Sequence, residues 1–397
     1  MKLNKHLSFL LGAGFSAPMG YPIGIDLNNL LLDCNKENFA FPSNGSLAVN
    51  TDGTKPSFGY KTSYDIEFEF CFELIQYFKK SRGSFDYEEF YDYIVDEVKN
   101  DKMVNELARP FLSTITSESS LISGLRKVYT QVVSYFLKDK DGNKYYDHLP
   151  YDMDRSFPGY SGVMNCISEL SNDYTINIHT LNHDLFFESF NNTDFLKGEL
   201  CDGFEELGSF YYGKLNVNSR QYMVRLSRYT GNYNTKFRIY KLHGSRNYEP
   251  FYHSEGGLFI PETYIKTRFG IGHTNHYKEI TNKDGLLDYE NSWVNYHADF
   301  LVGTTSKIER YKKPLLFKKL FKLFRENLRN SEKLVIIGYG AKDRFINQMI
   351  FENFKPTMVI PVIIDPYPSE MLKEFAEKLN AKIVTKQLED VVIKDID

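Results

Sequence analysis

The sequence has few cysteines, and none of them form a pair. The four cysteines among 397 residues are far apart in the chain, so no C-x-x-C motif occurs; they are Cys34, Cys71, Cys166 and Cys201. This spacing argues against a zinc ribbon and against a compact disulfide framework. We expect free thiols in a reducing compartment.

The sequence also lacks a long apolar run near its beginning. Lys2 and Lys5 precede a short apolar segment that stops at Gly12. A segment of that length is too short for the core of a signal peptide or for a membrane span. We therefore expect a cytoplasmic protein without membrane contact.

Positive charge is not in excess. The formal net charge is −4, with 25% charged and 42% hydrophobic residues. This composition is typical of a globular protein and supplies no overall positive field for nucleic acid, so we expect no direct nucleic-acid binding. Aromatic residues reach 16% of the chain, which favours extra interior or subunit surface and identifies no ligand.

The stretch around which the chain is organised is an apolar run, a glycine-rich turn and a helical pattern. Residues 7–11 predict a buried strand, and residues 26–32 predict a helix. Between them, Gly12 permits a tight turn, and Gly14 would let a ligand approach the main chain because it has no Cβ atom. Ala17 completes the spacing G-x-G-x-x-A of dinucleotide-binding turns; an ordinary turn after a buried strand is the alternative.

Apolar strands alternate with helical patterns along much of the chain. The expected strands cover residues 7–11, 174–178, 299–302, 333–337, 358–364 and 381–386. This alternation predicts an α/β fold, with a doubly wound, mainly parallel, Rossmann-like sheet. Ligands of such sheets bind beyond the carboxyl ends of the strands, where the polar turns would converge.

Two insertions interrupt this pattern. Residues 62–140 predict a helical insertion, and residues 204–294 an irregular, β-leaning insertion that includes the turn with His243. The remainder forms the expected sheet domain, in four pieces: residues 1–33, 165–203, 236–250 and 295–397. Residues 34–62 predict a long loop, which is either a cover over a site or a surface excursion.

Four polar turns stand out together, in this order. They are residues 12–16 (GAGFS), 180–184 (TLNHD), 241–245 (KLHGS) and 337–343 (IGYGAKD). This ordered set resembles the sirtuin superfamily, and most of all the bacterial sirtuin-like domains of antiphage defence systems. The resemblance covers the sheet segments and neither insertion.

The resemblance implies a site that binds NAD and breaks its nicotinamide–ribose bond. By position, Asn182 and His243 match the family's catalytic residues, and Asp184 would orient the turn or act electrostatically at the ribose. The expected NAD-binding residues are Gly12, Ala13, Gly14, Phe15, Ser16, Asp26, Gly303, Thr304, Gly338, Tyr339, Asp343 and Asp365. The chemistry suits these side chains, because an amide can hold water or a ribose hydroxyl and a histidine can accept a proton near neutral pH.

The sequence departs from the deacylating sirtuins, which carry two cysteine pairs that hold a structural zinc. The absence of such pairs favours NAD hydrolysis and requires no metal. An NAD-dependent protein deacylase and a non-catalytic sensor of NAD or ADP-ribose are the alternatives. A hydride-transfer enzyme is disfavoured, because a helix and a long loop follow the first turn where that fingerprint needs a second strand and an acidic residue.

Several of these residues have simpler interpretations. Asn182 could cap a helix that begins near Leu185, and Asp343 could cap the helix after its own turn. His179 and His183 could suggest a metal pair, but no carboxylate–histidine spacing supports it.

Partners are also suggested. Residues 314–333 predict an amphipathic basic helix, which is either a docking surface or a crossover helix with a solvated basic face. An enzyme that depletes NAD must stay silent until triggered. We therefore expect a homo-oligomer and, by analogy with the family, a HerA-type ATPase assembly as a partner.

Overall fold

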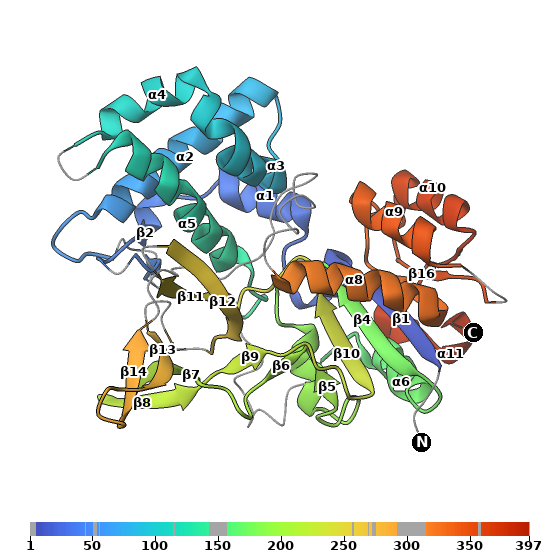
Figure 1. Ribbon diagram of the computed structural model, residues 1–397. Helices are drawn as coiled ribbons and strands as arrows, with labels where there is room; N and C mark the ends of the chain where they lie inside the picture. Colours follow the sequence, from blue (N-terminus) through green and yellow to red (C-terminus); the bar gives the residue numbers. More distant parts are fainter. Residues whose placement is uncertain are drawn as a thin grey trace.

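A seven-stranded parallel sheet forms the centre of the part of the chain that the computed structural model describes (Figure 1). The described residues are 5–43, 45–50, 54, 56–113, 116–142, 157–255, 258–268, 270–271, 275–291, 315–355 and 359–396. The strand order is β17-β16-β15-β1-β4-β10-β5, and every neighbouring pair is parallel. The strands are β1 (His6–Leu11), β4 (Thr175–Thr180), β5 (Leu200–Cys201), β10 (Phe237–Lys241), β15 (Ser331–Ile337), β16 (Val362–Ile364) and β17 (Lys382–Val384).

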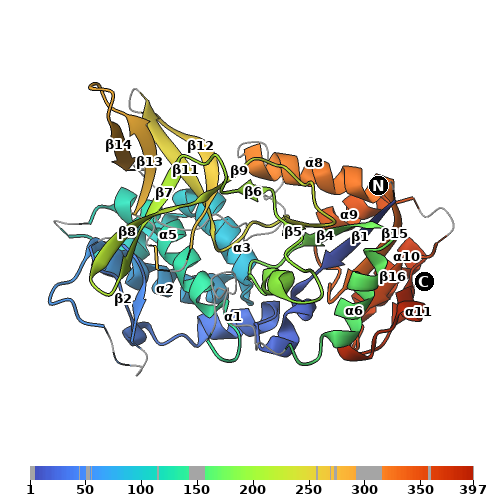
Figure 2. The ribbon, with the colours of Figure 1, turned by 90° about the horizontal axis from the view of Figure 1, so that it is seen from below.

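Both faces of this sheet are covered by apolar cores. In β1, Leu7, Phe9 and Leu11 belong to one core and Leu10 to the other. The first core includes α6 (Ser161–Leu170), and the second includes α8 (Leu315–Asn330), α9 (Arg344–Asn353) and α10 (Glu370–Leu379). Figure 2 shows α6 and α8 on opposite sides of the strands. The predicted α/β fold with a Rossmann-like parallel sheet is therefore confirmed.

The helical segment between the first two sheet strands has a core of its own. It contains α2 (Ser63–Arg82), α3 (Tyr87–Asp92), α4 (Lys102–Ala108) and α5 (Glu118–Phe136), and it includes a π-helical turn over Tyr93–Glu97. Helix α1 (Gly24–Leu32) contributes Leu27 and Leu31 to the same core. The helical segment is therefore packed against the helix that follows β1 in the chain.

Strands beyond the central sheet pair antiparallel. One sheet, within the described residues, contains β6 (Phe204–Glu205), β9 (Ser227–Tyr229), β11 (Tyr248–Glu255) and β12 (Leu258–Lys266). A second contains β7 (Tyr211–Val217), β8 (Arg220–Arg225), β13 (His276–Thr281) and β14 (Leu287–Asn291). The predicted loop 34–62 carries a short β2–β3 pair, Phe39–Ala40 with Ala48–Val49. The predicted strand 299–302 lies outside the described residues.

Helix α8 corresponds to the predicted basic helix. Its apolar side contributes six residues to the core under the sheet, which are Leu316, Phe317, Leu320, Phe321, Phe324 and Leu328. It is thus a crossover helix that covers the sheet, and its lysines face outward. Among the described helices, none is long and apolar enough to span a membrane.

The strand order creates a topological switch point at β1. Strand β4 lies on one side of β1 and β15 on the other, although both follow β1 in the chain. In open α/β sheets, the crevice at such a point, outside the carboxyl ends of the strands, is where ligands bind. The turns after β1, β4, β10 and β15 are therefore the place to look for a site.

Candidate active site at the carboxyl edge of the sheet

The turns after neighbouring strands are tied to one another by backbone hydrogen bonds. Gly12 N–H donates to Ile337 O (3.0 Å), Leu181 N–H to Leu11 O (3.1 Å), and Leu242 N–H to Thr180 O (2.9 Å). These bonds continue the sheet ladder by one step past each strand. The structure thus brings together all four turns that the sequence analysis singled out.

The glycines after β1 and β15 pack backbone against backbone. A Cβ atom on Gly12 would lie 2.5 Å from Gly338 O, and one on Gly14 would lie 2.7 Å from Gly338 Cα. Gly14 N–H donates to Gly338 O (2.9 Å), and Gly338 itself has φ +61°. The turn after β15 fills the place that a Cβ atom of Gly14 would take, so packing requires a glycine here, and the approach of a ligand to Gly14 stays a prediction.

Asn182 joins the turn after β4 to the turn after β1. Its Nδ2 group donates to Gly12 O (3.0 Å) and to Ser16 Oγ (3.1 Å). Asn182 N–H donates to Thr180 Oγ1 (3.0 Å). The side chain does not act as the predicted helix cap. A short 3₁₀ helix, Phe187–Asn192, replaces the helix expected from Leu185, and its N-cap residue, Phe186, has no side-chain cap.

Other predicted binding residues of the first turn divide into exposed and buried positions. Ala13 is exposed, whereas Ser16 is buried under Asn182. Phe15 is fully buried and packs on Tyr160, with ring centroids 5.3 Å apart. Because its ring belongs to the core, Phe15 offers a ligand at most its backbone. Asp26 is exposed and accepts from Ile23 N–H (3.2 Å) at the start of α1.

His243 and Asp343 meet across the carboxyl edge. His243 Nε2 lies 3.4 Å from Asp343 Oδ2, and the histidine is 5% exposed. Asp343 also caps α9, because its Oδ1 accepts from Phe345 N–H (3.0 Å) and Ile346 N–H (3.2 Å). One carboxylate therefore performs the capping role that the sequence left open and also reaches the candidate catalytic histidine. A carboxylate in this position can fix the orientation of an imidazole.

Tyr339 holds the turn that carries Asp343. Its hydroxyl donates to Asp343 O (3.1 Å) and Asn347 Oδ1 (2.8 Å), and its ring is 4% exposed. Burial, with the nearby Asp343 charge as a second cause, raises the pKa of Tyr339 well above its usual range. The ring is thus a neutral support of the turn that positions Asp343.

Asp184 lies deeper than Asn182 and is 7% exposed. Its Oδ1 accepts from Phe186 N–H (2.9 Å), which holds the turn, and its backbone carbonyl accepts from Lys241 Nζ. Lys241 also pairs with Glu188 at 2.9 Å, inside the protein. These contacts correspond to the turn-orienting role that the sequence analysis considered for Asp184.

Two predicted binding residues are not described and one lies at the edge. Gly303 and Thr304 lie outside the described residues. Asp365 follows β16, is partly exposed, and accepts from Tyr367 N–H through Oδ1 (2.8 Å). Its contact with a ligand stays a prediction.

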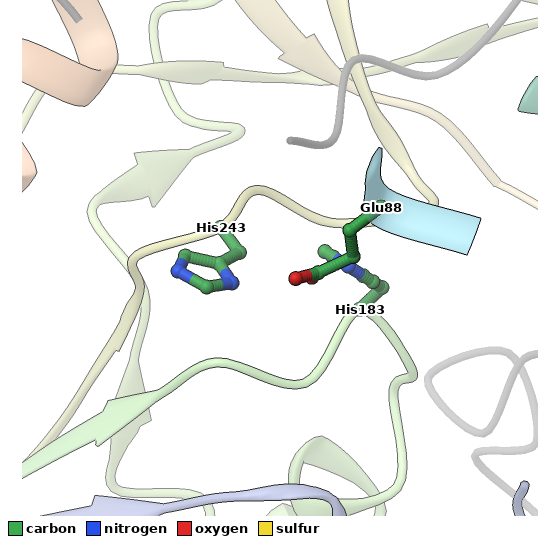
Figure 3. A group of neighbouring side chains, drawn as sticks. All are labelled: Glu88, His183 and His243. Atoms are coloured by element: carbon green, nitrogen blue, oxygen red, sulfur yellow. The ribbon is translucent and has the colours of Figure 1, made fainter. Parts of the chain in front are cut away.

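The helical segment contributes a residue that the sequence analysis did not single out. Glu88, in the first turn of α3, lies beside His183 and His243, and one ligand atom of each lies within 4.8 Å of the others. Figure 3 shows the Glu88 carboxylate extending from its helix toward the ring of His243, with His183 next to it. The centroids of the two histidine rings are 6.1 Å apart. No local pattern marks Glu88, because its place depends on how the helical segment packs.

Further contacts anchor the helical segment at this edge. Arg246, after β10, donates through Nη2 to Ser134 O (3.0 Å) and through Nη1 to Leu137 O, at the carboxyl end of α5. Tyr87 N–H donates to Asn28 Oδ1 (2.8 Å), and Lys140 N–H donates to Met19 O (3.0 Å). The helical segment therefore faces the turns of the sheet directly.

Comparisons with known proteins add little to this geometry. No family model matches the sequence, and the search of curated proteins found no match. Among solved structures, a Sir2 enzyme aligns with a TM-score of 0.33 and 11% identity, over 99% of this chain and 91% of that one. A Sir2 homologue variant with 2′-O-acetyl ADP-ribose aligns with a TM-score of 0.33 and 10% identity, over 100% and 92% of the two chains. A Sir2 homologue–NAD complex gives 0.33 and 10%, over 99% and 88%. Likeness at this level does not establish a family.

The class of the protein follows from its own architecture. It is an α/β protein with a Rossmann-like parallel sheet, and its polar turns gather at the switch point of that sheet. The candidate site at this edge comprises the His243–Asp343 pair, with Glu88 and His183 beside it, and Asn182 on the neighbouring turn after β4.

Proposed function

We propose that this chain is a sirtuin-like NAD glycohydrolase, which cleaves the nicotinamide–ribose bond of NAD to give nicotinamide and ADP-ribose. The observation that supports the proposal most is that the turns carrying Asn182, His243 and Asp343 adjoin at one edge of the sheet, beside the switch point, where His243 pairs with Asp343. An amide and a carboxylate-oriented imidazole at one edge suit a reaction that needs a positioned water and a proton acceptor.

The reaction uses few groups because nicotinamide is a cationic leaving group. It departs with the electrons of the glycosidic bond and becomes neutral, so it needs no proton. Water attacks the ribose carbon, which has become oxocarbenium-like, and its proton passes to the imidazole of His243. Asn182, held by Gly12 O and Ser16 Oγ, would orient the water or a ribose hydroxyl without changing charge.

Hydrolysis is favoured over deacylation by the cysteines. Cys34, Cys71 and Cys166 are buried, and Cys201 is partly buried. Within the described part of the chain, none of them belongs to a group of three or more potential metal ligands. A four-cysteine zinc site of the kind found in deacylating sirtuins therefore finds no counterpart among these cysteines.

In the cell, we assign the activity to antiphage defence by NAD depletion. Such an enzyme needs a trigger, and we propose that it acts in the cytoplasm as a homo-oligomer with a HerA-type ATPase assembly as its partner. These biological roles rest on the resemblance of the four turns alone.

The proposal is tested by incubating the purified chain with NAD and measuring nicotinamide. We expect Asn182→Ala and His243→Ala each to lower kcat by about 10²–10⁴-fold. Matched controls are Asn29→Ala, which is exposed on α1, and His6→Ala, at the opposite end of β1. Both controls should keep full activity.

Three outcomes would contradict the proposal. Full activity in both site variants would remove the site assignment. Nicotinamide release that requires an acyl-lysine peptide would identify a deacylase instead. Tight NAD binding without release of nicotinamide, with and without the partner, would identify a sensor.

A further inference from the structure

The cluster of Glu88, His183 and His243 has the composition of a metal site. The two imidazoles are each 5% exposed, and the carboxylate is partly buried. Two imidazoles and one carboxylate form the ligand set of many zinc sites that keep a fourth position open. Imidazole nitrogen also favours zinc and similar transition metals over magnesium and calcium, which prefer oxygen.

The spacing is compatible with such a site after a small movement. One ligand atom of each residue lies within 4.8 Å of the others. Two ligand atoms of a tetrahedral zinc lie about 3.4 Å apart, given zinc–ligand bonds of about 2.0–2.2 Å. Each pair of ligand atoms therefore has to approach by at most about 1.4 Å, through small rotations of the Glu88 side chain and of the two imidazole rings.

The surroundings hold the ligands in orientation. Asp343 Oδ2 lies 3.4 Å from His243 Nε2, and Figure 3 shows one ring nitrogen of His243 on the side of Glu88 and the other turned away. In zinc sites, a histidine that binds the metal through one ring nitrogen commonly donates the N–H of the other to a carboxylate. The backbone of Glu88 is held in turn, because Asp86 Oδ1 accepts from Glu88 N–H (2.9 Å), and the Tyr87 hydroxyl donates to Glu88 Oε1 (3.3 Å).

We propose that Glu88, His183 and His243 bind one Zn²⁺ ion, with Asp343 as the residue that orients His243. The three ligands come from α3 and from the turns after β4 and β10, so the ion would join the helical segment to the sheet. This inference departs from the expectation that the protein uses no metal. Of the two histidines considered as a metal pair in the sequence, only His183 belongs to this site. His179 is buried within the sheet and stacks on Tyr240 (4.9 Å).

The test is a titration of the chelator-stripped full chain with Zn²⁺, followed by calorimetry and by metal analysis of the dialysed protein. We expect one Zn²⁺ per chain and a higher melting temperature when it is bound. Glu88→Gln and His183→Gln should each weaken binding more than 100-fold, whereas Asp343→Asn should weaken it about 10–100-fold. Cobalt substitution supplies a second readout, because the visible spectrum reports coordination by nitrogen and oxygen.

The matched control for the carboxylate is Glu89→Gln, one residue further along α3 and exposed. The control for the imidazole is His6→Gln, at the opposite end of β1. Both should bind zinc as the unchanged chain does. The proposal is overturned if the unchanged chain takes up no zinc, or if Glu88→Gln binds it equally well. Because Glu88 is partly exposed, this variant is expected to fold, which circular dichroism checks.

A consequence for catalysis follows where the proposed function also holds. Zinc on His243 occupies a lone pair of the imidazole that we assign as proton acceptor. We therefore expect removal of zinc by a chelator to raise nicotinamide release by the unchanged chain. The same chelator should not change nicotinamide release by the Glu88→Gln variant, which no longer binds zinc. The zinc titration contains no NAD, so failure of the hydrolase proposal and failure of the zinc proposal give separate results.

Discussion

Gly338 has no room for a side chain, and its backbone angle is unfavourable for one. A Cβ atom there would lie 2.4 Å from both Gly14 C and Phe15 N, at φ +61°. We predict that Gly338→Ala lowers the free energy of unfolding by about 2–4 kcal/mol, from overpacking and left-handed strain together. Denaturant unfolding of the variant and of the unchanged chain measures this difference in free energy. The control is Gly340→Ala, where the nearest atom is Lys342 Cγ at 4.0 Å; equal stability of the two variants would refute the packing explanation.

His179 is an acid-sensitive point in the middle of the sheet. It is fully buried against Tyr240 and Phe324, and, within the described residues, neither ring nitrogen has a hydrogen-bond partner. Burial lowers its pKa to about 3. The unfolded chain binds a proton near pH 6.5 and the folded chain does not, so this residue's contribution to stability is present above pH 6.5 and is lost as the pH falls toward 3.

We predict that His179→Leu reduces the acid sensitivity of unfolding. Relative to the variant, the unchanged chain should lose about 1.4 kcal/mol for each pH unit between pH 6 and pH 4. Denaturant unfolding at pH 8, 6 and 4 measures the difference. Parallel pH profiles of the two proteins would show that His179 is not the group responsible.

The site residues show what a sequence can and cannot supply. Asn182, His243 and Asp343 were predicted from the resemblance of the ordered set of polar turns, and parallel strands place such turns at one edge. Phe15 was assigned to the ligand because it lies within the glycine-rich turn, yet its ring packs into the core. Glu88 was not predicted, because its position depends on tertiary packing of a helix with no local signal.

Helix α9 begins at a residue that serves two purposes. Asp343 caps the helix through Oδ1 and reaches His243 through Oδ2. We predict that Asp343→Ala costs about 1 kcal/mol of stability, whereas Asp343→Asn, which keeps a capping oxygen, costs a few tenths. If the proposed function holds, both variants lose NAD hydrolysis. Thermal unfolding and nicotinamide release separate the two effects; a stable and fully active Asp343→Ala would remove both roles.

Strand boundaries were predictable to different degrees. The first strand was expected at residues 7–11 and extends over His6–Leu11, because a continuous apolar run ends at a glycine. Within the strand expected at residues 358–364, the described residues form a strand over Val362–Ile364. Apolar character extends beyond the hydrogen-bonded part of this strand, and Pro361 has no N–H to donate to a ladder. The seven-strand order itself could not be predicted, since hydrophobic pattern does not say which strands are neighbours.

The molecule as a whole depends on contacts between its helical segment and the sheet edge. Arg246 is 3% exposed and donates to the last carbonyl groups of α5, where a positive charge also suits the helix dipole. We predict that Arg246→Gln lowers the free energy of unfolding by about 1.5–3 kcal/mol. Hydrogen exchange should rise first at the end of α5. Arg220→Gln, at an exposed end of β8, is the control, and identical exchange in both would contradict the anchoring role.

The position of β1 has a consequence for synthesis of the chain. Its residue His6 pairs with Thr175 on one side and with Ser331 on the other. Strand β1 is therefore synthesised before both of its neighbours in the sheet, and contacts of such large sequence separation form slowly. A translation product that stops before β15 lacks the wall against which Gly12 and Gly14 pack. The edge that carries the four turns therefore cannot be assembled until β15 has been synthesised.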